Sequence, residues 1–179
     1  MTLPDQLTVL RVAAVPVVVL LYAWDFDNHA YWATTIFVLA MATDQVDGWL
    51  ARRRGQSSQL GKLLDPVADK VLVLAALVML VGEGVAPSWM VALIVVREIL
   101  VSGLRLAALE RGVVLGARDL GRVKTWAQAV AATIAGYAAA GAWGDDVAWW
   151  ALLIALIATW ISGLDYARVA PRVLRGEGA

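Results

Sequence analysis

Residue types that often carry enzymatic chemistry are scarce in this sequence of 179 residues. It contains no cysteine, which excludes disulfide bonds, thiolate metal sites and cysteine nucleophiles. Its one histidine, His29, lies far from the acidic motif described below, so we also exclude a phosphohistidine intermediate. Charged residues make up only 17% of the chain, 61% are hydrophobic, and the mean hydropathy is +0.71. This composition indicates an integral membrane protein rather than a soluble globule.

The hydrophobic segments predict an all-α fold with six transmembrane helices. Each segment is about long enough to cross a hydrocarbon core of ~30 Å. We place the helices at roughly residues 6–24, 31–53, 58–82, 87–111, 121–142 and 147–170. No linker or low-complexity tract separates them, so we expect one six-helix domain over residues 1–179.

Lysine and arginine are missing from three alternate loops of this arrangement. The loops DFDNH, GEGVAPS and GDD contain none of the 15 basic residues, most of which are found on the other side and in the C-terminal tail. Cytoplasmic loops of membrane proteins are enriched in Lys and Arg. Both termini are therefore predicted to lie in the cytoplasm.

Four aspartates stand out in this apolar chain, in the pattern DxxDGxxAR followed after eight residues by GxxxDxxxD. They are Asp44, Asp47, Asp65 and Asp69. Spacings of three and four place each pair on one face of its own helix. Carboxylates inside a membrane are costly and mark functional sites by default. Two facing helices would bring four negative charges together, which two divalent cations would balance, as in two-metal phosphoryl transfer.

Simpler readings exist for single residues of this motif. Asp65 precedes Pro66 and would serve as a helix cap, and Asp69 with Lys70 would form an ordinary interfacial charge pair. These readings do not explain all four aspartates at regular spacing around a basic loop. Hard cations such as Mg²⁺ or Mn²⁺ suit the oxygen ligands.

The stretch from Asp44 to Asp69 resembles the signature of the CDP-alcohol phosphatidyltransferase family, integral membrane enzymes with six transmembrane helices. The resemblance implies that the four aspartates bind the metal and that Asp69 is the base that deprotonates the acceptor hydroxyl. It also implies a set of residues that bind CDP-diacylglycerol, namely Gly48, Arg52, Ser58 and Thr8. Independently of it, Gly48 allows a close backbone approach and Arg52 offers a bidentate fork for phosphate oxygens.

Three further stretches resemble the bacterial members of that family whose acceptor is glycerol 3-phosphate. They are LTVLRVAAVP, VREILVSGLR and GRVKTWAQ, although Asp5 stands where that group commonly has Asn. The resemblance implies transfer of a phosphatidyl group from CDP-diacylglycerol to sn-glycerol 3-phosphate, giving phosphatidylglycerol phosphate and CMP. It also implies a multi-pass protein of the bacterial plasma membrane with its active site at the cytoplasmic face.

A basic cluster is the candidate site for the acceptor phosphate, since guanidinium and ammonium groups suit a phosphate monoester. Its members are Arg105, Lys124, Arg118 and Arg97. Alternatively, Arg97 and Glu98 form a structural clamp in the middle of the fourth predicted helix, and the other residues merely follow the basic character of cytoplasmic loops.

Other functions remain open at this stage. Family members with a different acceptor, such as cardiolipin synthase or phosphatidylinositol phosphate synthase, would share the aspartate motif. From other classes, a small ion transporter or a structural membrane scaffold would also carry intramembrane charges. We expect the bilayer and the two substrates as partners and no nucleic acid. Gly112 and Gly116 form a GxxxG pattern, which is weak evidence for a homodimer because it lies near a helix end.

Overall fold

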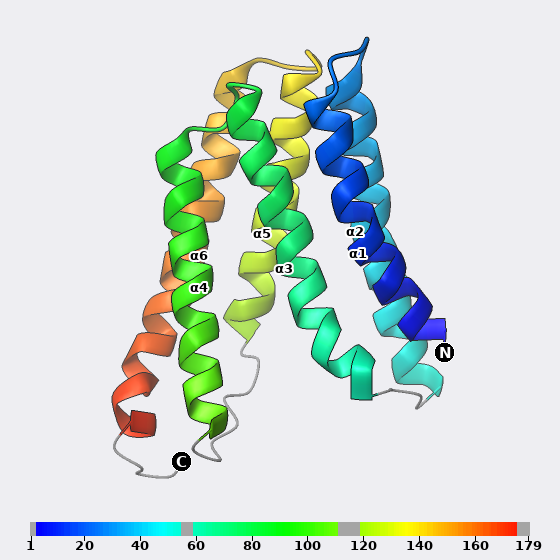
Figure 1. The fold of residues 1–179 in the computed structure, drawn as a ribbon. Coiled ribbons are helices and arrows are strands. Elements are labelled where there is room, and N and C mark those ends of the chain that lie inside the picture. Colours follow the sequence, from blue (N-terminus) through cyan, green and yellow to red (C-terminus); the bar gives the residue numbers. More distant parts are fainter. Residues whose placement is uncertain (1–2, 55–58, 111–118, 175–179) are drawn as a thin grey trace.

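The computed structural model describes residues 3–54, 59–110 and 119–174, and within these ranges it gives side chains for residues 9–43, 70–108 and 123–164. The described residues form six helices and no strand, so the all-α prediction is confirmed. Figure 1 shows the helices running up and down as one bundle. They are α1 (Leu3–Ala23), α2 (His29–Arg54), α3 (Gln59–Gly82), α4 (Ser88–Glu110), α5 (Asp119–Ala139) and α6 (Asp145–Leu174).

The helix ends follow local backbone chemistry. α5 ends at Ala139, three residues before the predicted end, because Gly141 adopts a left-handed φ of 79°. The amides of Gly141 and Ala142 then donate to the carbonyls of Ala138 and Tyr137, a closing motif that satisfies the last carbonyls of the helix. α4 begins at Ser88, directly after Pro87, so the proline precedes the first turn instead of lying within it.

α5 lies at the centre of the bundle, in contact with α2, α3 and α6. α1 packs on α2 and α3, whereas α4 packs on α3 and α6. α2 ends and α3 begins at the lower end of the bundle in Figure 1, which we call the motif end, and α1 starts and α6 finishes at that same end. The chain therefore enters and leaves the bundle on the side that carries the aspartate motif.

The bundle is polar at several buried positions and apolar over much of its surface. Leu20, Ile99 and Ile154 are each about 60% exposed, with 59%, 64% and 62% of their surface accessible. By contrast, Arg97 and Glu98 keep only 2% of theirs. Water would favour the opposite distribution, because apolar burial drives the folding of soluble proteins. Large apolar side chains that face outwards in such numbers mark a surface made for an apolar environment.

Not every helix is uniformly apolar. By length and composition, one segment of the described chain, Asp145–Leu164, is long and apolar enough to span a membrane, and Val9–Ala23 and Lys70–Gly82 are shorter apolar stretches. Charged residues within α4, such as Arg97 and Glu98, interrupt its apolar sequence. Six helices are thus confirmed in the described residues, while their crossing of a bilayer stays a prediction.

A polar contact joins two loops at the end opposite the motif. The His29 Nε2 atom lies 3.2 Å from both oxygens of Glu83, and its Nδ1 atom lies 3.1 Å from the Phe26 carbonyl oxygen. Burial alone would lower the pKa of His29, but the hydrogen bond to Phe26 and the adjacent Glu83 carboxylate together raise it above its usual value. The contact ties His29, the first residue of α2, to the loop after α3.

Candidate functional site

The two halves of the aspartate motif lie on neighbouring helices. Asp44 and Asp47 are in the second half of α2, and Asp65 and Asp69 are in the first half of α3. α2 and α3 contact each other, and the two motif segments lie near the same end of the bundle in Figure 1. The side chains of these four residues lie outside the described part of the structure, so the convergence of their carboxylates stays a prediction.

The predicted residues for CDP-diacylglycerol fall in the same region. Gly48 and Arg52 belong to the last turns of α2, and Thr8 belongs to α1, which packs on both α2 and α3. The side chains at these three positions lie outside the described part of the structure. Ser58 and Arg118, together with Gly112 and Gly116, lie outside the described residues altogether. Among the described side chains, no group of three or more His, Asp or Glu residues offers a metal site elsewhere.

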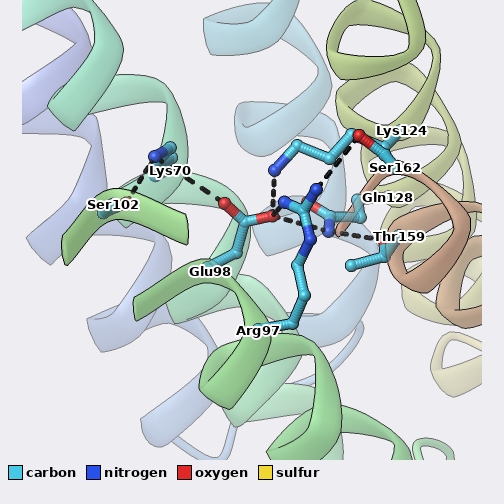
Figure 2. Close-up of polar contacts among 8 residues, drawn as sticks. All are labelled: Lys70, Arg97, Glu98, Ser102, Lys124, Gln128, Thr159 and Ser162. Carbon is cyan, nitrogen blue, oxygen red and sulfur yellow. Dashed lines mark hydrogen bonds and ion pairs between the residues drawn. The ribbon is translucent and has the colours of Figure 1, made fainter. Parts of the chain in front are cut away.

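Glu98 is the centre of a buried polar cluster, drawn in Figure 2. Its Oε1 atom accepts hydrogen bonds from the Lys124 Nζ atom, from Arg97 Nη1 at 2.9 Å and from Gln128 Nε2 at 3.3 Å. The Nζ atom of Lys70 lies 3.7 Å from the other oxygen, Oε2. One carboxylate therefore faces three cations, which come from α3, α4 and α5.

Side chains of α6 complete this Glu98 cluster. Arg97 Nη2 donates to Ser162 Oγ at 3.0 Å, and Gln128 Nε2 donates to Thr159 Oγ1 at 2.8 Å. Gly163 lies against the Arg97 side chain, since a Cβ atom at this position would be 3.0 Å from Arg97 Nε. The cluster thus comprises Lys70, Arg97, Glu98, Ser102, Lys124, Gln128, Thr159 and Ser162.

The cations of this region differ in their access to solvent. The side chains of Arg97 and Lys124 keep 2% and 9% of their surface, whereas Lys70 keeps 31%. Arg105 is half-buried, two helical turns along α4 from Glu98, and close enough to Lys70 for their positive charges to repel. Of the four predicted phosphate ligands, the structure brings Arg97 and Lys124 together on Glu98 and leaves Arg105 nearer the surface.

Several polar residues of the cluster were not among the predicted site residues. The sequence predicts for Lys70 only an interfacial charge pair with Asp69, and it marks no site residue in the sixth helix. The sequence signal for Glu98 is its position inside an apolar helix, and the predicted alternative of a structural Arg97–Glu98 clamp is based on that position. No comparable signal marks Thr159 or Ser162, because hydroxyl residues are common in apolar helices.

Arg11 is another buried cation that the predicted site did not include. It lies on α1, in the middle of an apolar stretch, and is only 2% exposed. A buried arginine requires partners for its five donors, so α1 also takes part in the polar interior. In the sequence, the sign of such a buried charge is that Arg11 interrupts the first hydrophobic segment.

Comparison with known proteins agrees with the motif. The family profile described as CDP-alcohol phosphatidyltransferase matches residues 1–161. A Bacillus subtilis protein named CDP-diacylglycerol–glycerol-3-phosphate 3-phosphatidyltransferase is 42% identical over 141 residues, which cover 72% of this chain and 73% of the relative. A Mycobacterium tuberculosis protein named probable phosphatidylglycerophosphate synthase is 37% identical over 179 residues, covering 97% of this chain and 84% of the relative. An Escherichia coli protein with the same name as the Bacillus relative is 41% identical over 135 residues, covering 72% and 73%.

Proposed function

Because the chain belongs to the CDP-alcohol phosphatidyltransferase family and is therefore a phosphatidyltransferase, we propose that its acceptor is sn-glycerol 3-phosphate. The donor would be CDP-diacylglycerol, and the products phosphatidylglycerol phosphate and CMP. The observation that carries this proposal is the similarity over most of the chain to relatives named for this donor and acceptor, or for the product phosphatidylglycerophosphate. Family membership also favours an enzyme over an ion transporter or a scaffold.

The apolar exterior supports a multi-pass membrane protein. A lipid donor reaches the site sideways from the bilayer, while glycerol 3-phosphate and CMP are water-soluble. Such a site belongs at the membrane surface, and the motif end is the side where α2 finishes with the basic residues Arg52, Arg53 and Arg54. We place this end in the cytoplasm of a bacterial cell, with both termini on the same side.

Four carboxylates fit a site for divalent cations in their donor chemistry and in their placement. All four supply hard oxygen ligands, and their backbones lie on contacting helices near one end of the bundle. Asp44, Asp47, Asp65 and Asp69 would hold two ions, Mg²⁺ or Mn²⁺. When bound, these ions would neutralise charge on the pyrophosphate of the donor.

The protein's own groups would supply the remaining chemistry. In the reaction, the acceptor oxygen forms a bond to the phosphorus of the phosphatidyl group, the bond from that phosphorus to the CMP oxygen breaks, and CMP leaves. Asp69 would take the proton of the acceptor hydroxyl. Gly48, Arg52, Ser58 and Thr8 would orient the donor. Arg105 would contact the acceptor phosphate directly, and the buried Arg97 and Lys124 would add positive charge from behind Glu98, with Arg118 as a further ligand.

An acceptor screen tests this proposal. Purified protein receives CDP-diacylglycerol and Mg²⁺ or Mn²⁺, and CMP release is measured with glycerol 3-phosphate, glycerol, phosphatidylglycerol and inositol 1-phosphate in parallel. Of the four acceptors, we expect only glycerol 3-phosphate to support CMP release. EDTA should abolish this turnover, and added metal should restore it. Preferred turnover of phosphatidylglycerol or the inositol phosphate would assign another acceptor. Full activity after exhaustive chelation would refute the metal site.

Replacing single aspartates separates metal binding from proton transfer. We expect Asp69→Asn to lose turnover even at saturating metal, because removal of a general base typically costs about 10²–10⁴-fold in rate. Asp44→Asn should instead raise the metal concentration needed for half-maximal activity. The measurement is CMP release over a metal titration. Nearly normal turnover of Asp69→Asn would assign the base elsewhere.

A further inference from the structure

Lys70 is the cation of the Glu98 cluster that is most open to a ligand. Its Nζ atom donates to Ser102 Oγ at 2.7 Å and lies 3.7 Å from Glu98 Oε2. An ammonium group has three donors, so one short hydrogen bond and one longer ion pair leave capacity for another acceptor. Its side chain is 31% exposed, in contrast to the enclosed Arg97 and Lys124.

The charge balance around Lys70 favours an anion. Three cations, Lys70, Arg97 and Lys124, share the single carboxylate of Glu98, and the Arg105 guanidinium adds a repulsive positive charge nearby. Like charges held together at low dielectric are costly, and a bound dianion relieves that cost. The two cations of this group that reach the surface, Lys70 and Arg105, would contact such an anion directly.

The position of Lys70 in α3 connects this anion site to the aspartate motif. Lys70 directly follows Asp69 and begins the apolar stretch of the helix. A phosphate held at Lys70 therefore lies beside the segment that carries the proposed base. In glycerol 3-phosphate the reacting hydroxyl and the phosphate are at opposite ends of a three-carbon chain, so adjacent sites for the two groups are what this acceptor needs.

We propose that Lys70 binds the phosphate of the acceptor together with Arg105, and that Glu98 and Ser102 position its ammonium group. This inference rests on the proposed function. Behind Lys70, Glu98 is fixed by Arg97, Lys124 and Gln128. Arg97 and Gln128 are fixed in turn by hydroxyl groups of α6. The buried cluster is thus a framework, and Lys70 is its contact with the substrate.

Kinetics of Lys70 variants test the proposal. For Lys70→Met we expect the KM for glycerol 3-phosphate to rise roughly 10- to 100-fold, as for loss of a charge-assisted hydrogen bond. The KM for CDP-diacylglycerol and the metal dependence should stay within about twofold of wild type, because a phosphate contact does not act on them. Lys70→Arg, which keeps the charge, should recover part of the loss. Ser102→Ala should raise the same KM by a smaller factor.

Two further measurements exclude a merely structural effect. Arg168→Met removes a basic residue of α6 beyond the cluster and should keep the wild-type KM values. Glycerol 3-phosphate should raise the thermal unfolding temperature of the wild-type protein in detergent, and Lys70→Met should lose this shift at the same ligand concentration. The preference for glycerol 3-phosphate over glycerol should also fall in Lys70→Met.

The possible failures are distinguishable. If wild type uses glycerol 3-phosphate and Lys70→Met keeps its KM for it, only the role of Lys70 is refuted. A parallel rise in the KM for both substrates, or in the metal requirement, would likewise refute it, since the change would then report damage to the aspartate site. If wild type prefers an acceptor without a phosphate, the proposed function fails, and the phosphate contact fails with it.

Discussion

The carboxylate of Glu98 neutralises cations from three helices. Its Oε1 atom alone accepts from Arg97, Lys124 and Gln128. A buried ion pair is not in itself stabilising relative to an apolar core, but removing one partner leaves the other charge uncompensated. The stability of this region should therefore depend on the negative charge more than on the shape of the side chain.

We expect Glu98→Gln to lower the free energy of unfolding by about 3 kcal/mol or more, as for a broken buried ion pair. Thermal or denaturant unfolding in detergent measures it. Glu83→Gln, at the part-exposed contact with His29, is the matched control and should cost less than about 1 kcal/mol. Adding Lys124→Met to Glu98→Gln should recover part of the loss by removing a stranded cation. Wild-type stability of Glu98→Gln would contradict the role of its charge.

At the residue scale, the sequence predicted which charged residues are buried better than it predicted the residues that they contact. Arg97 and Glu98 stood out because charged residues are costly in an apolar helix, and both are buried as expected. Their contacts with Gln128 and Ser162 join residues 30 and 65 positions apart in the chain, so they depend on helix packing that local patterns do not encode. The same holds for Lys70, for which the sequence predicted only a charge pair with Asp69, whereas its partners Ser102 and Glu98 lie on another helix.

At the element scale, helix positions followed directly from the hydrophobic segments. All six predicted helices are present, and each begins and ends within four residues of its predicted limits. At the end of α5, which comes three residues early, Gly141 closes the helix although the apolar sequence continues. Hydropathy reports the environment of a segment, whereas the backbone conformation of one glycine determines where the helix stops.

The packing of α5 on α2, and of α6 on α4, depends on two glycines that face buried side chains. A Cβ atom at Gly136 of α5 would lie 2.2 Å from Thr34 Oγ1 and 2.8 Å from the hydroxyl oxygen of Tyr22. These two groups share a buried hydrogen bond of 2.9 Å, so they have little freedom to move apart. At Gly163 of α6 the nearest atom to a Cβ is Arg97 Nε at 3.0 Å, which is a milder conflict.

A series of Gly→Ala variants should rank in the order of these distances. Gly103→Ala is the control, because a Cβ there meets nothing within 4 Å, and it should be neutral or slightly stabilising. We expect Gly163→Ala to be less stable than the control, and Gly136→Ala to lose about 1–3 kcal/mol, as for overpacking in a close-packed interior. Unfolding temperatures in detergent provide the ranking. Equal stability of all three variants would show that the helices move apart to accommodate the added methyl group without loss of stability.

At the scale of the whole molecule, polarity is distributed in a way that suits a membrane. Isolated apolar residues at a protein surface need no explanation, but here they recur along every helix whose side chains are described. The polar interior then has a simple reason, because charged groups that cannot reach water must pair with one another. In a bundle of this kind, the residues that bind the substrates lie where helices end, at the boundary between lipid and water.

The loops at the two ends of the bundle should lie on opposite sides of the membrane. The chain has no cysteine, so single cysteines can be labelled without background. Asp25 lies in an exposed loop and suits this purpose better than Asn28, whose left-handed φ of 62° a cysteine would strain. Asp25→Cys should react with a membrane-impermeant maleimide on intact cells, since its loop is predicted to face outwards. Gln56→Cys, in the basic connection between α2 and α3, should react only after the membrane is opened. Labelling of both cysteines from the same side would overturn the topology and remove the aspartate motif from the cytoplasmic face.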